Sequence, residues 1–152
     1  MKSFYLACLF LFSAKVYAFP KEGNYVRFLA THNGKVFEYK KSLLEFHNET
    51  NSFTMIEKIS TDEETIEERV TQLPFFWFYT EKKVQNVLNN CTRREGALGT
   101  WDLQGKEIPA CTFFSEDSQM DYVIGMVPFG QLRFQYHLGK EEFLDFYLQD
   151  FY

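Results

Sequence analysis

The sequence lacks the compact signatures of the common enzyme classes. It contains no G-x-S-x-G elbow, H-E-x-x-H helix, P-loop or EF-hand loop. Its three histidines lie in or beside different predicted strands, and no two of them have the spacing of metal ligands. A catalytic site would have to join polar groups from distant segments, such as His137 with Glu116 or Asp117. We therefore expect a protein that is not an enzyme and that uses no cofactor.

Positive charge and long apolar runs are also scarce. The chain has 16 Lys and Arg against 21 Asp and Glu, a formal net charge of −5, and an acidic surface of this kind repels nucleic acid. The apolar run at residues 4–12 is far shorter than the roughly 20 residues that a membrane-spanning helix needs. We expect no nucleic-acid partner, and no transmembrane segment in the mature chain.

The N-terminus has the pattern of a secretory signal peptide. Lys2 precedes the apolar run, and Val16 and Ala18 occupy the small-residue positions of a cleavage site. Residues 1–18 are predicted to be the signal peptide and residues 19–152 a single secreted β-rich domain, with 14 basic and 21 acidic side chains and a charge of −7. The expected location is extracellular, with the lysosomal lumen as the alternative.

Cysteine is as rare as histidine, with three residues of each in the chain. Cys8 leaves with the signal peptide, and Cys91 and Cys111 remain, a pair that predicts one intramolecular disulfide in an oxidising compartment. Asn48 and Asn90 each begin an N-glycosylation sequon. Cys91 occupies the middle position of the second sequon, so bridge formation there competes with sugar addition.

Short β-type runs separated by turn residues predict an antiparallel sheet. The runs cover residues 25–31, 35–40, 42–47, 52–60 and 65–73. The sequence His32-Asn33-Gly34 between the first two favours a tight hairpin turn. The segment at residues 48–51 turns the chain again. We expect a mainly β fold with a strongly curved sheet of about eight strands, arranged as a half-barrel or a two-layer sandwich.

What the sequence has in abundance is aromatic residues, five of them consecutive in LPFFWFYT. If this segment is a strand, parity places Phe75, Trp77 and Tyr79 on one face, with Phe76 and Phe78 on the other. Such a strand needs cover on both faces. We expect a central strand that either packs fully or lines an apolar cavity.

The C-terminal half is predicted as a series of different elements. Residues 84–90 form a further strand, the glycine-containing segment between the cysteines forms a stapled loop, and residues 120–127 and 131–138 form a hairpin around the turn at 128–130. The tail has apolar residues at 143, 144, 147, 148 and 151, close to helical spacing. It is predicted to be one amphipathic helix laid on the sheet.

The order of these segments resembles the N-terminal half of ependymin-related proteins, which belong to the lipoprotein-carrier-like (LolA-like) folds. The resemblance covers roughly residues 24–95 and rests on NGKVFEYK, SFTMIEKIS, TIEERVTQL and FWFYTEKKVQNVLNNC, with Arg93 and Arg94 behind the cysteine. It implies a curved sheet with a hydrophobic cleft, apolar ligand binding, extracellular or lysosomal residence and possible Ca²⁺ dependence. The residues Gly99-Thr100-Trp101 imitate a lipocalin motif, and a lipocalin-like carrier is the rival interpretation.

The leading hypothesis is a secreted, non-enzymatic binding protein with an apolar cleft for a lipid or another hydrophobic molecule. Its expected ligand-binding residues are Phe75, Trp77, Tyr79, Phe134 and Tyr136. The alternative is an extracellular interaction or matrix glycoprotein with a solid core, whose acidic surface binds another protein or Ca²⁺. A weak Ca²⁺ site in the acidic cluster at residues 62–68 is the one metal hypothesis, and a solvated charged turn explains that cluster as well.

Overall fold

A computed structural model describes residues 19–32, 35–62, 64–138 and 143–152, with only the backbone of Phe143. The expected signal peptide and the Asn33-Gly34 pair lie outside the described residues, as does Glu63 of the acidic cluster.

The described chain forms one antiparallel sheet of nine strands in the order β4-β3-β2-β1-β9-β8-β7-β6-β5. Within the described ranges, the outer strands β4 and β5 do not pair with each other, so the sheet is not closed. The mainly β prediction is confirmed. The strands are β1 (Tyr25–His32), β2 (Lys35–His47), β3 (Ser52–Ser60), β4 (Thr65–Pro74), β5 (Ala97–Leu103), β6 (Lys106–Ser115), β7 (Met120–Gly125), β8 (Gln131–His137) and β9 (Phe143–Phe151).

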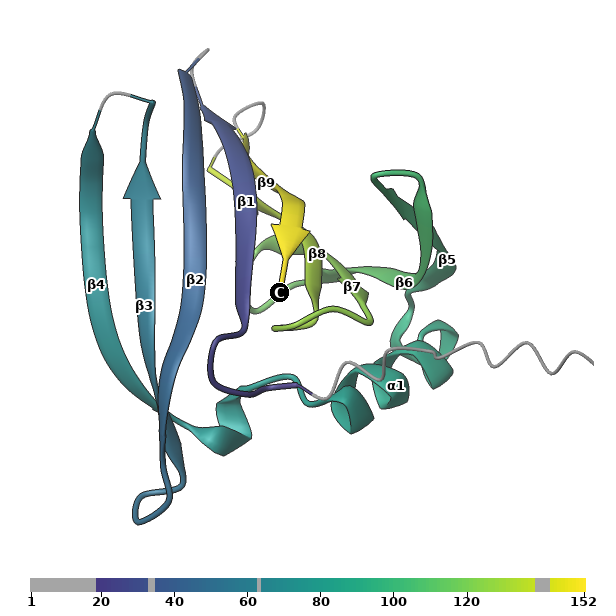
Figure 1. Cartoon of the computed structure of the whole chain (residues 1–152). Helices are drawn as coiled ribbons and strands as arrows, with labels where there is room; N and C mark the ends of the chain where they lie inside the picture. Colours follow the sequence, from purple (N-terminus) through teal and green to yellow (C-terminus); the bar gives the residue numbers. More distant parts are fainter. Residues whose placement is uncertain (1–18, 33–34, 63, 139–142) are drawn as a thin grey trace, which may run out of the picture.

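The sheet bends so that strands far apart in its order face each other. Figure 1 shows β1 to β4 as long upright strands, while β9 to β5 turn away behind and beside them. Ile59 of β3 and Arg69 of β4 line the same hollow as Phe134 of β8. We call this side of the sheet the inner face. On the opposite, outer face, Trp101 of β5 stacks on Tyr147 of β9 with ring centroids 6.2 Å apart.

The first four strands follow the predicted meander. Turn residues 48–51 separate β2 from β3, as expected, and alternation places Phe53 and Met55 in the core while their neighbour Thr54 stays partly exposed. Residues 35–47 form one strand of 13 residues instead of two runs. A register shift between Leu43 and Glu45 bends it there, which explains the interrupted periodicity.

The aromatic segment is not a strand, and the prediction of a central strand there was wrong. After Pro74, residues Phe75–Trp77 form the 3₁₀ turn η1, closed by a hydrogen bond from the Phe78 amide to the Phe75 carbonyl (3.1 Å). The ammonium of Lys83 donates to the Phe78 carbonyl at 3.1 Å and thereby satisfies a backbone group that has no sheet partner.

The predicted strand at residues 84–90 is instead the helix α1 (Glu81–Asn89). Thr80 caps its N-terminus by accepting a hydrogen bond from the Lys83 amide. Val84, Val87 and Leu88 fall on one buried face, because their spacing of three and four residues matches the helical repeat. This face packs against β6 and β7, and Figure 1 shows α1 along the lower end of those strands.

The predicted C-terminal helix was also wrong, because the tail forms strand β9. This strand pairs with β1 on one side and β8 on the other. Phe146 and Leu148 are buried, whereas Tyr147 between them is 41% exposed. Two neighbouring strands with free backbone edges therefore override the helical spacing of the apolar residues.

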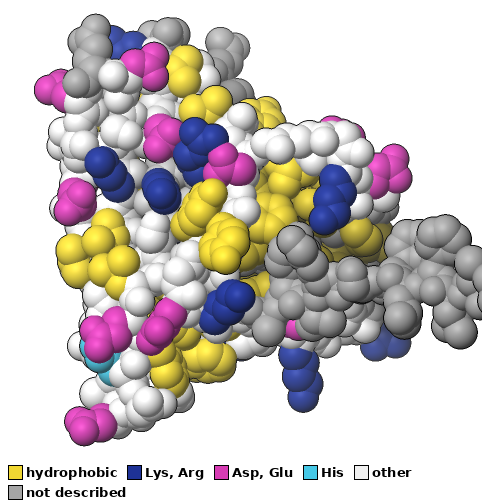
Figure 2. Space-filling view, in the orientation of Figure 1, with side chains coloured by type: hydrophobic (Ala, Val, Ile, Leu, Met, Phe, Trp, Pro, Cys, Tyr) yellow, Lys and Arg dark blue, Asp and Glu magenta, His cyan; other side chains and the backbone are white. Residues whose placement is uncertain are grey.

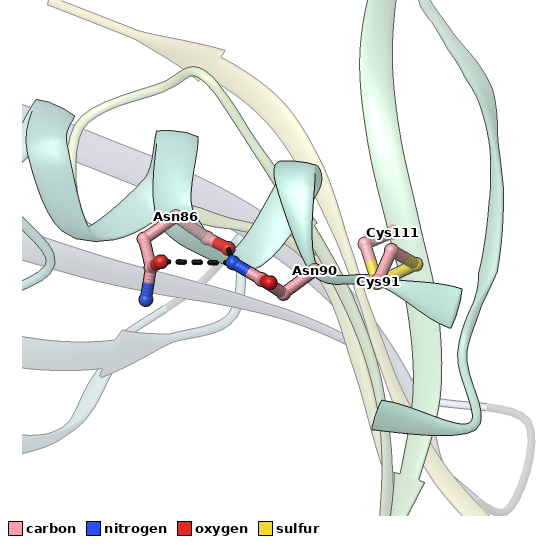
Figure 3. The surroundings of a disulfide bond; sticks show 4 residues. All are labelled: Asn86, Asn90, Cys91 and Cys111. Carbon is pink, nitrogen blue, oxygen red and sulfur yellow. Dashed lines mark hydrogen bonds between the residues drawn. A yellow bond between two sulfur atoms is a disulfide. The ribbon is translucent and has the colours of Figure 1, made fainter. Parts of the chain in front are cut away.

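The segment between the cysteines is the hairpin β5–β6, turned at Gln104 and Gly105, and is not the expected loop. The predicted disulfide is confirmed: Cys91 and Cys111 are bonded and fully buried. Figure 3 shows the bond joining the chain just after α1 to strand β6. The predicted hairpin around the turn at 128–130 is confirmed as β7 and β8.

Candidate ligand site on the inner face

An aromatic hollow opens on the inner face where β4 comes opposite β8 and β9. Its volume is about 280 Å³. One wall is a set of packed rings, in which Phe134 and Phe146 stack with centroids 4.4 Å apart and Tyr39 meets Phe146 edge-on at 5.5 Å. Packing of this kind holds the wall in one arrangement before any ligand arrives. The lining residues are Tyr39, Glu57, Ile59, Glu67, Arg69, Phe134, Tyr136 and Phe146.

The other wall of the aromatic hollow is polar and open to solvent. The Tyr39 hydroxyl donates to the carboxylate of Glu57. Burial and this hydrogen bond raise the pKa of Tyr39 above its usual range, so the phenol stays protonated. Glu67 and Arg69 are exposed on the edge strand β4. The hollow thus has an aromatic floor and a charged rim.

A second, smaller hollow of about 150 Å³ lies beside Trp77. Its wall includes Phe129, which is buried although its backbone has a φ of +63°. This left-handed conformation is rare for a residue with a large side chain. The turn it creates between β7 and β8 places the Phe129 ring 6.1 Å from that of Phe78. This Trp77 hollow is lined by Lys41, Met55, Leu73, Trp77, Phe78, Tyr79, Phe129 and Gln131.

Lys41 connects the two hollows. It lies on the inner face of β2 and lines the Trp77 hollow. Its ammonium lies 5.3 Å from the centre of the Tyr39 ring and 5.7 Å from that of Phe134, both of which line the aromatic hollow. Burial lowers the pKa of Lys41, and the nearby charge of Glu57 partly opposes that effect.

The five expected ligand-binding residues do not share one cavity. Phe134 and Tyr136 line the aromatic hollow, whereas Trp77 and Tyr79 line the Trp77 hollow. Phe75 borders neither of them and lines a wide depression with Pro20, Lys21, Glu22, Phe46 and Phe53. The single apolar cleft expected from the aromatic segment and the last hairpin is thus divided between separate hollows, and the ligand-binding role of these residues stays a prediction.

Sequence reasoning missed Lys41 and Gln131. Lys41 looks like an ordinary strand lysine among Lys40 and other polar residues, and Gln131 opens a hairpin strand. The available signal was strand parity. Tyr39, Lys41 and Leu43 alternate along β2 and therefore share one face, on which Leu43 is buried. A lysine in register with core residues is rarer than one on a solvated face.

The other candidate groups lie elsewhere. His137 hydrogen-bonds to Asp121 through its Nε2 atom at 2.7 Å, a partner that the sequence reasoning did not consider beside Glu116 and Asp117. Among the residues that the structure describes, no group of three or more His, Cys, Asp or Glu is placed to hold a metal ion. Glu63 is not among them, so a Ca²⁺ site stays a hypothesis.

The outer face carries paired charges. Arg27 binds Glu38 at 3.2 Å and also binds Asp150, while Arg133 donates to Asp145 at 2.8 Å. Figure 2 shows acidic and basic side chains next to one another among separate hydrophobic clusters. In the part of the chain described, no helix has the length and apolar character needed to cross a membrane.

Comparison of the chain with protein-family models, with curated proteins and with solved structures finds no match.

Proposed function

We propose that this chain is a secreted, non-enzymatic binding protein that takes up a lipid or another hydrophobic molecule on the inner face of its sheet. The observation that carries the proposal is the pair of adjoining hollows with aromatic and aliphatic walls. Ligand sites are typically concave and mainly apolar, with a few polar groups that fix orientation. Tyr39, Lys41 and Gln131 are such groups here.

The difference between the two faces supports this use of the inner one. On the outer face, Arg27 and Arg133 are each paired with carboxylates. The inner face carries both hollows, and Tyr136 of β8 lies at the rim of the aromatic one. Covering apolar surface contributes about 25 cal/mol per Å² before the costs of association are subtracted.

The resemblance to ependymin-related proteins and to LolA-like folds belongs to the same proposal. An open, bent antiparallel sheet with a helix against one end is compatible with it. Secretion and residence outside the cell or in the lysosomal lumen are proposed on the signal-peptide pattern. A buried disulfide is compatible with an oxidising compartment.

Two exposed tyrosines on opposite faces provide a matched test. Tyr136 on the inner face and Tyr147 on the outer face are 39% and 41% exposed, on neighbouring strands. We expect Tyr136→Ala to weaken binding of the uncharged methyl ester of a fluorescent fatty acid several-fold, by roughly 1 kcal/mol for one lost aromatic contact. Tyr147→Ala should leave the affinity unchanged.

Lipid extraction followed by mass spectrometry should also recover bound lipid from the purified secreted protein. A protein that carries no lipid and does not bind the fluorescent fatty acid would contradict the proposal. That result would favour the alternative of an interaction or matrix protein with a solid core.

A further inference from the structure

The Trp77 hollow contains one charged residue, Lys41. The other seven lining residues are apolar or uncharged: Met55, Leu73, Trp77, Phe78, Tyr79, Phe129 and Gln131. The Lys41 ammonium is hydrogen-bonded to Gln131, another residue that lines this hollow, so the cation lies beside a mostly apolar space.

The ammonium of Lys41 has few partners. It donates one hydrogen bond, of 3.2 Å, to the side-chain oxygen of Gln131. It forms no ion pair with any carboxylate in the described part of the chain. Because an ammonium has three donors, a ligand oxygen could accept a further hydrogen bond from it.

Glu57 does not fill that role. Its charge acts on Lys41 at a distance beyond ion-pair contact, and its carboxylate already accepts the hydrogen bond from Tyr39. Burial of a cation without a contacting counter-charge is unfavourable. An anion delivered into the Trp77 hollow would supply that counter-charge and would itself be stabilised.

The charge distribution also selects between the two hollows. The aromatic hollow has two carboxylates, Glu57 and Glu67, against the single guanidinium of Arg69. A ligand anion placed there would be repelled by the excess negative charge. The Trp77 hollow has only the positive charge of Lys41.

We propose that the ligand is an acidic amphiphile whose carboxylate binds Lys41 and Gln131 while its chain passes Met55 and Leu73 toward Trp77. The inference rests on the proposed function and names the ligand class for the same inner face. The hollow of 150 Å³ has the volume of about five water molecules, so it accommodates the head group and the first few carbons. The rest of the chain would leave at the rim, where Trp77 is 68% exposed.

Decanoate and decanol separate the head group from the chain. Binding of each to the full mature protein is measured by titration calorimetry for the wild type, for Lys41→Met and for the neighbouring control Lys40→Met. Lys40 points to the other face, with its ammonium 4.6 Å from the Tyr25 ring. We expect the wild type to bind decanoate at least tenfold more tightly than decanol. Lys41→Met should remove this preference, and Lys40→Met should retain it.

The outcomes distinguish this inference from the proposed function. If the wild type binds both probes equally, or if Lys41→Met retains the preference for decanoate, the Lys41 inference is wrong while hydrophobic binding stands. If neither probe binds any of the three proteins, both the inference and the proposed function are wrong.

A second experiment uses only the wild type, so its result does not depend on whether the Lys41→Met variant folds. Lysines are acetylated with a trace of acetic anhydride, with or without decanoate, and the extent at each site is read by mass spectrometry. We expect decanoate to reduce acetylation of Lys41 several-fold and to leave Lys40 unchanged, whereas decanol should protect neither. Equal acetylation of Lys41 with and without decanoate would overturn the inference.

Discussion

Gly130 occupies a position where a side chain would collide with the aromatic segment. Its φ is +70°, and a Cβ atom built on it would lie 2.9 Å from Cβ and Cγ of Tyr79 and 3.1 Å from Val84. The same turn holds Phe129 at positive φ against Phe78. A strained turn is therefore maintained by close packing between the last hairpin and the start of α1.

Replacing Gly130 with alanine should destabilise the protein by about 1–3 kcal/mol, because the backbone strain and the contact with Tyr79 add together. The measurement is urea unfolding at equilibrium. Gly99→Ala is the matched control, since a Cβ there would meet no atom within 4 Å. A Gly130→Ala protein as stable as the Gly99→Ala protein would contradict the packing described at this turn.

Lys41 should reduce stability at neutral pH, because burial disfavours its charged form. We expect Lys41→Met to raise the free energy of unfolding by about 1 kcal/mol. Replacing a residue that serves binding at a cost in stability often has this effect. The pKa of Lys41 is lowered in the folded state, so the unfolded chain binds more protons as the pH approaches the ordinary lysine value. Wild-type stability then rises relative to that of the variant.

The advantage of Lys41→Met in thermal unfolding should therefore shrink between pH 7 and pH 10. Glu57 and Tyr39 face the same ammonium and belong to both proteins, so the comparison isolates Lys41. An advantage that grows with pH would contradict the lowered pKa.

At the scale of elements, the sequence predicted strands well where alternation and turn residues agreed. Residues 52–60 and 65–73 show both signals and match β3 and β4 closely. The aromatic segment was read by parity alone, and the strand predicted there was wrong. A capping threonine at Thr80, followed by apolar residues at helical spacing, was the available signal for α1.

The tail could not be assigned from local pattern. Residues 143–151 fit both a helical face and a strand that alternates around Phe146 and Leu148. Pairing with β8 and with β1, which lies more than 100 residues earlier in the chain, decides between them. Similarly, the two hollows depend on curvature that brings β4 opposite β8, and no short segment of sequence encodes that approach.

The disulfide fastens α1 to the sheet. Cys91 follows the helix and Cys111 lies in β6, 20 residues later. Gly96 passes so close that a Cβ there would lie 2.9 Å from both sulfur atoms. We expect the double variant Cys91→Ala, Cys111→Ala to lose about 3 kcal/mol in the free energy of unfolding, from the entropy of a loop of this length. Guanidinium unfolding checks this, and a loss below about 1 kcal/mol would mean that packing alone holds α1.

The two sequons differ in their access to the glycosylation machinery. Asn48 is exposed in the turn between β2 and β3. Asn90 is half-buried at the end of α1, and its side-chain nitrogen donates to the backbone and side-chain oxygens of Asn86, both at 2.9 Å (Figure 3). The nitrogen that would carry the sugar is therefore already engaged.

Expression through a eukaryotic secretory pathway should give one glycan, at Asn48. Mass spectrometry before and after enzymatic deglycosylation measures site occupancy, and Asn48→Gln should abolish the mass difference. Full occupancy of Asn90 in the wild type would show that sugar addition precedes formation of the contacts with Asn86 and of the disulfide.

At the scale of the whole molecule, the sheet uses its two faces differently. The outer face pairs Arg27 and Arg133 with carboxylates and packs Trp101 of the β5–β6 hairpin on Tyr147. The inner face bends into two hollows connected by Lys41, with Trp77 at the rim of one of them. We propose that a hydrophobic ligand binds at this inner face.

The two tryptophans of the chain lie in these different environments, so their fluorescence can report ligand binding at each face separately. Trp101→Phe leaves Trp77 as the only tryptophan, and Trp77→Phe leaves Trp101. The most direct measurement is quenching of tryptophan fluorescence by a bromine-labelled fatty acid below its micelle concentration, because bromine quenches only at short range. We predict saturable quenching of Trp77 in the Trp101→Phe protein and little quenching of Trp101 in the Trp77→Phe protein. Equal quenching of both tryptophans, or none of Trp77, would contradict binding at the inner face.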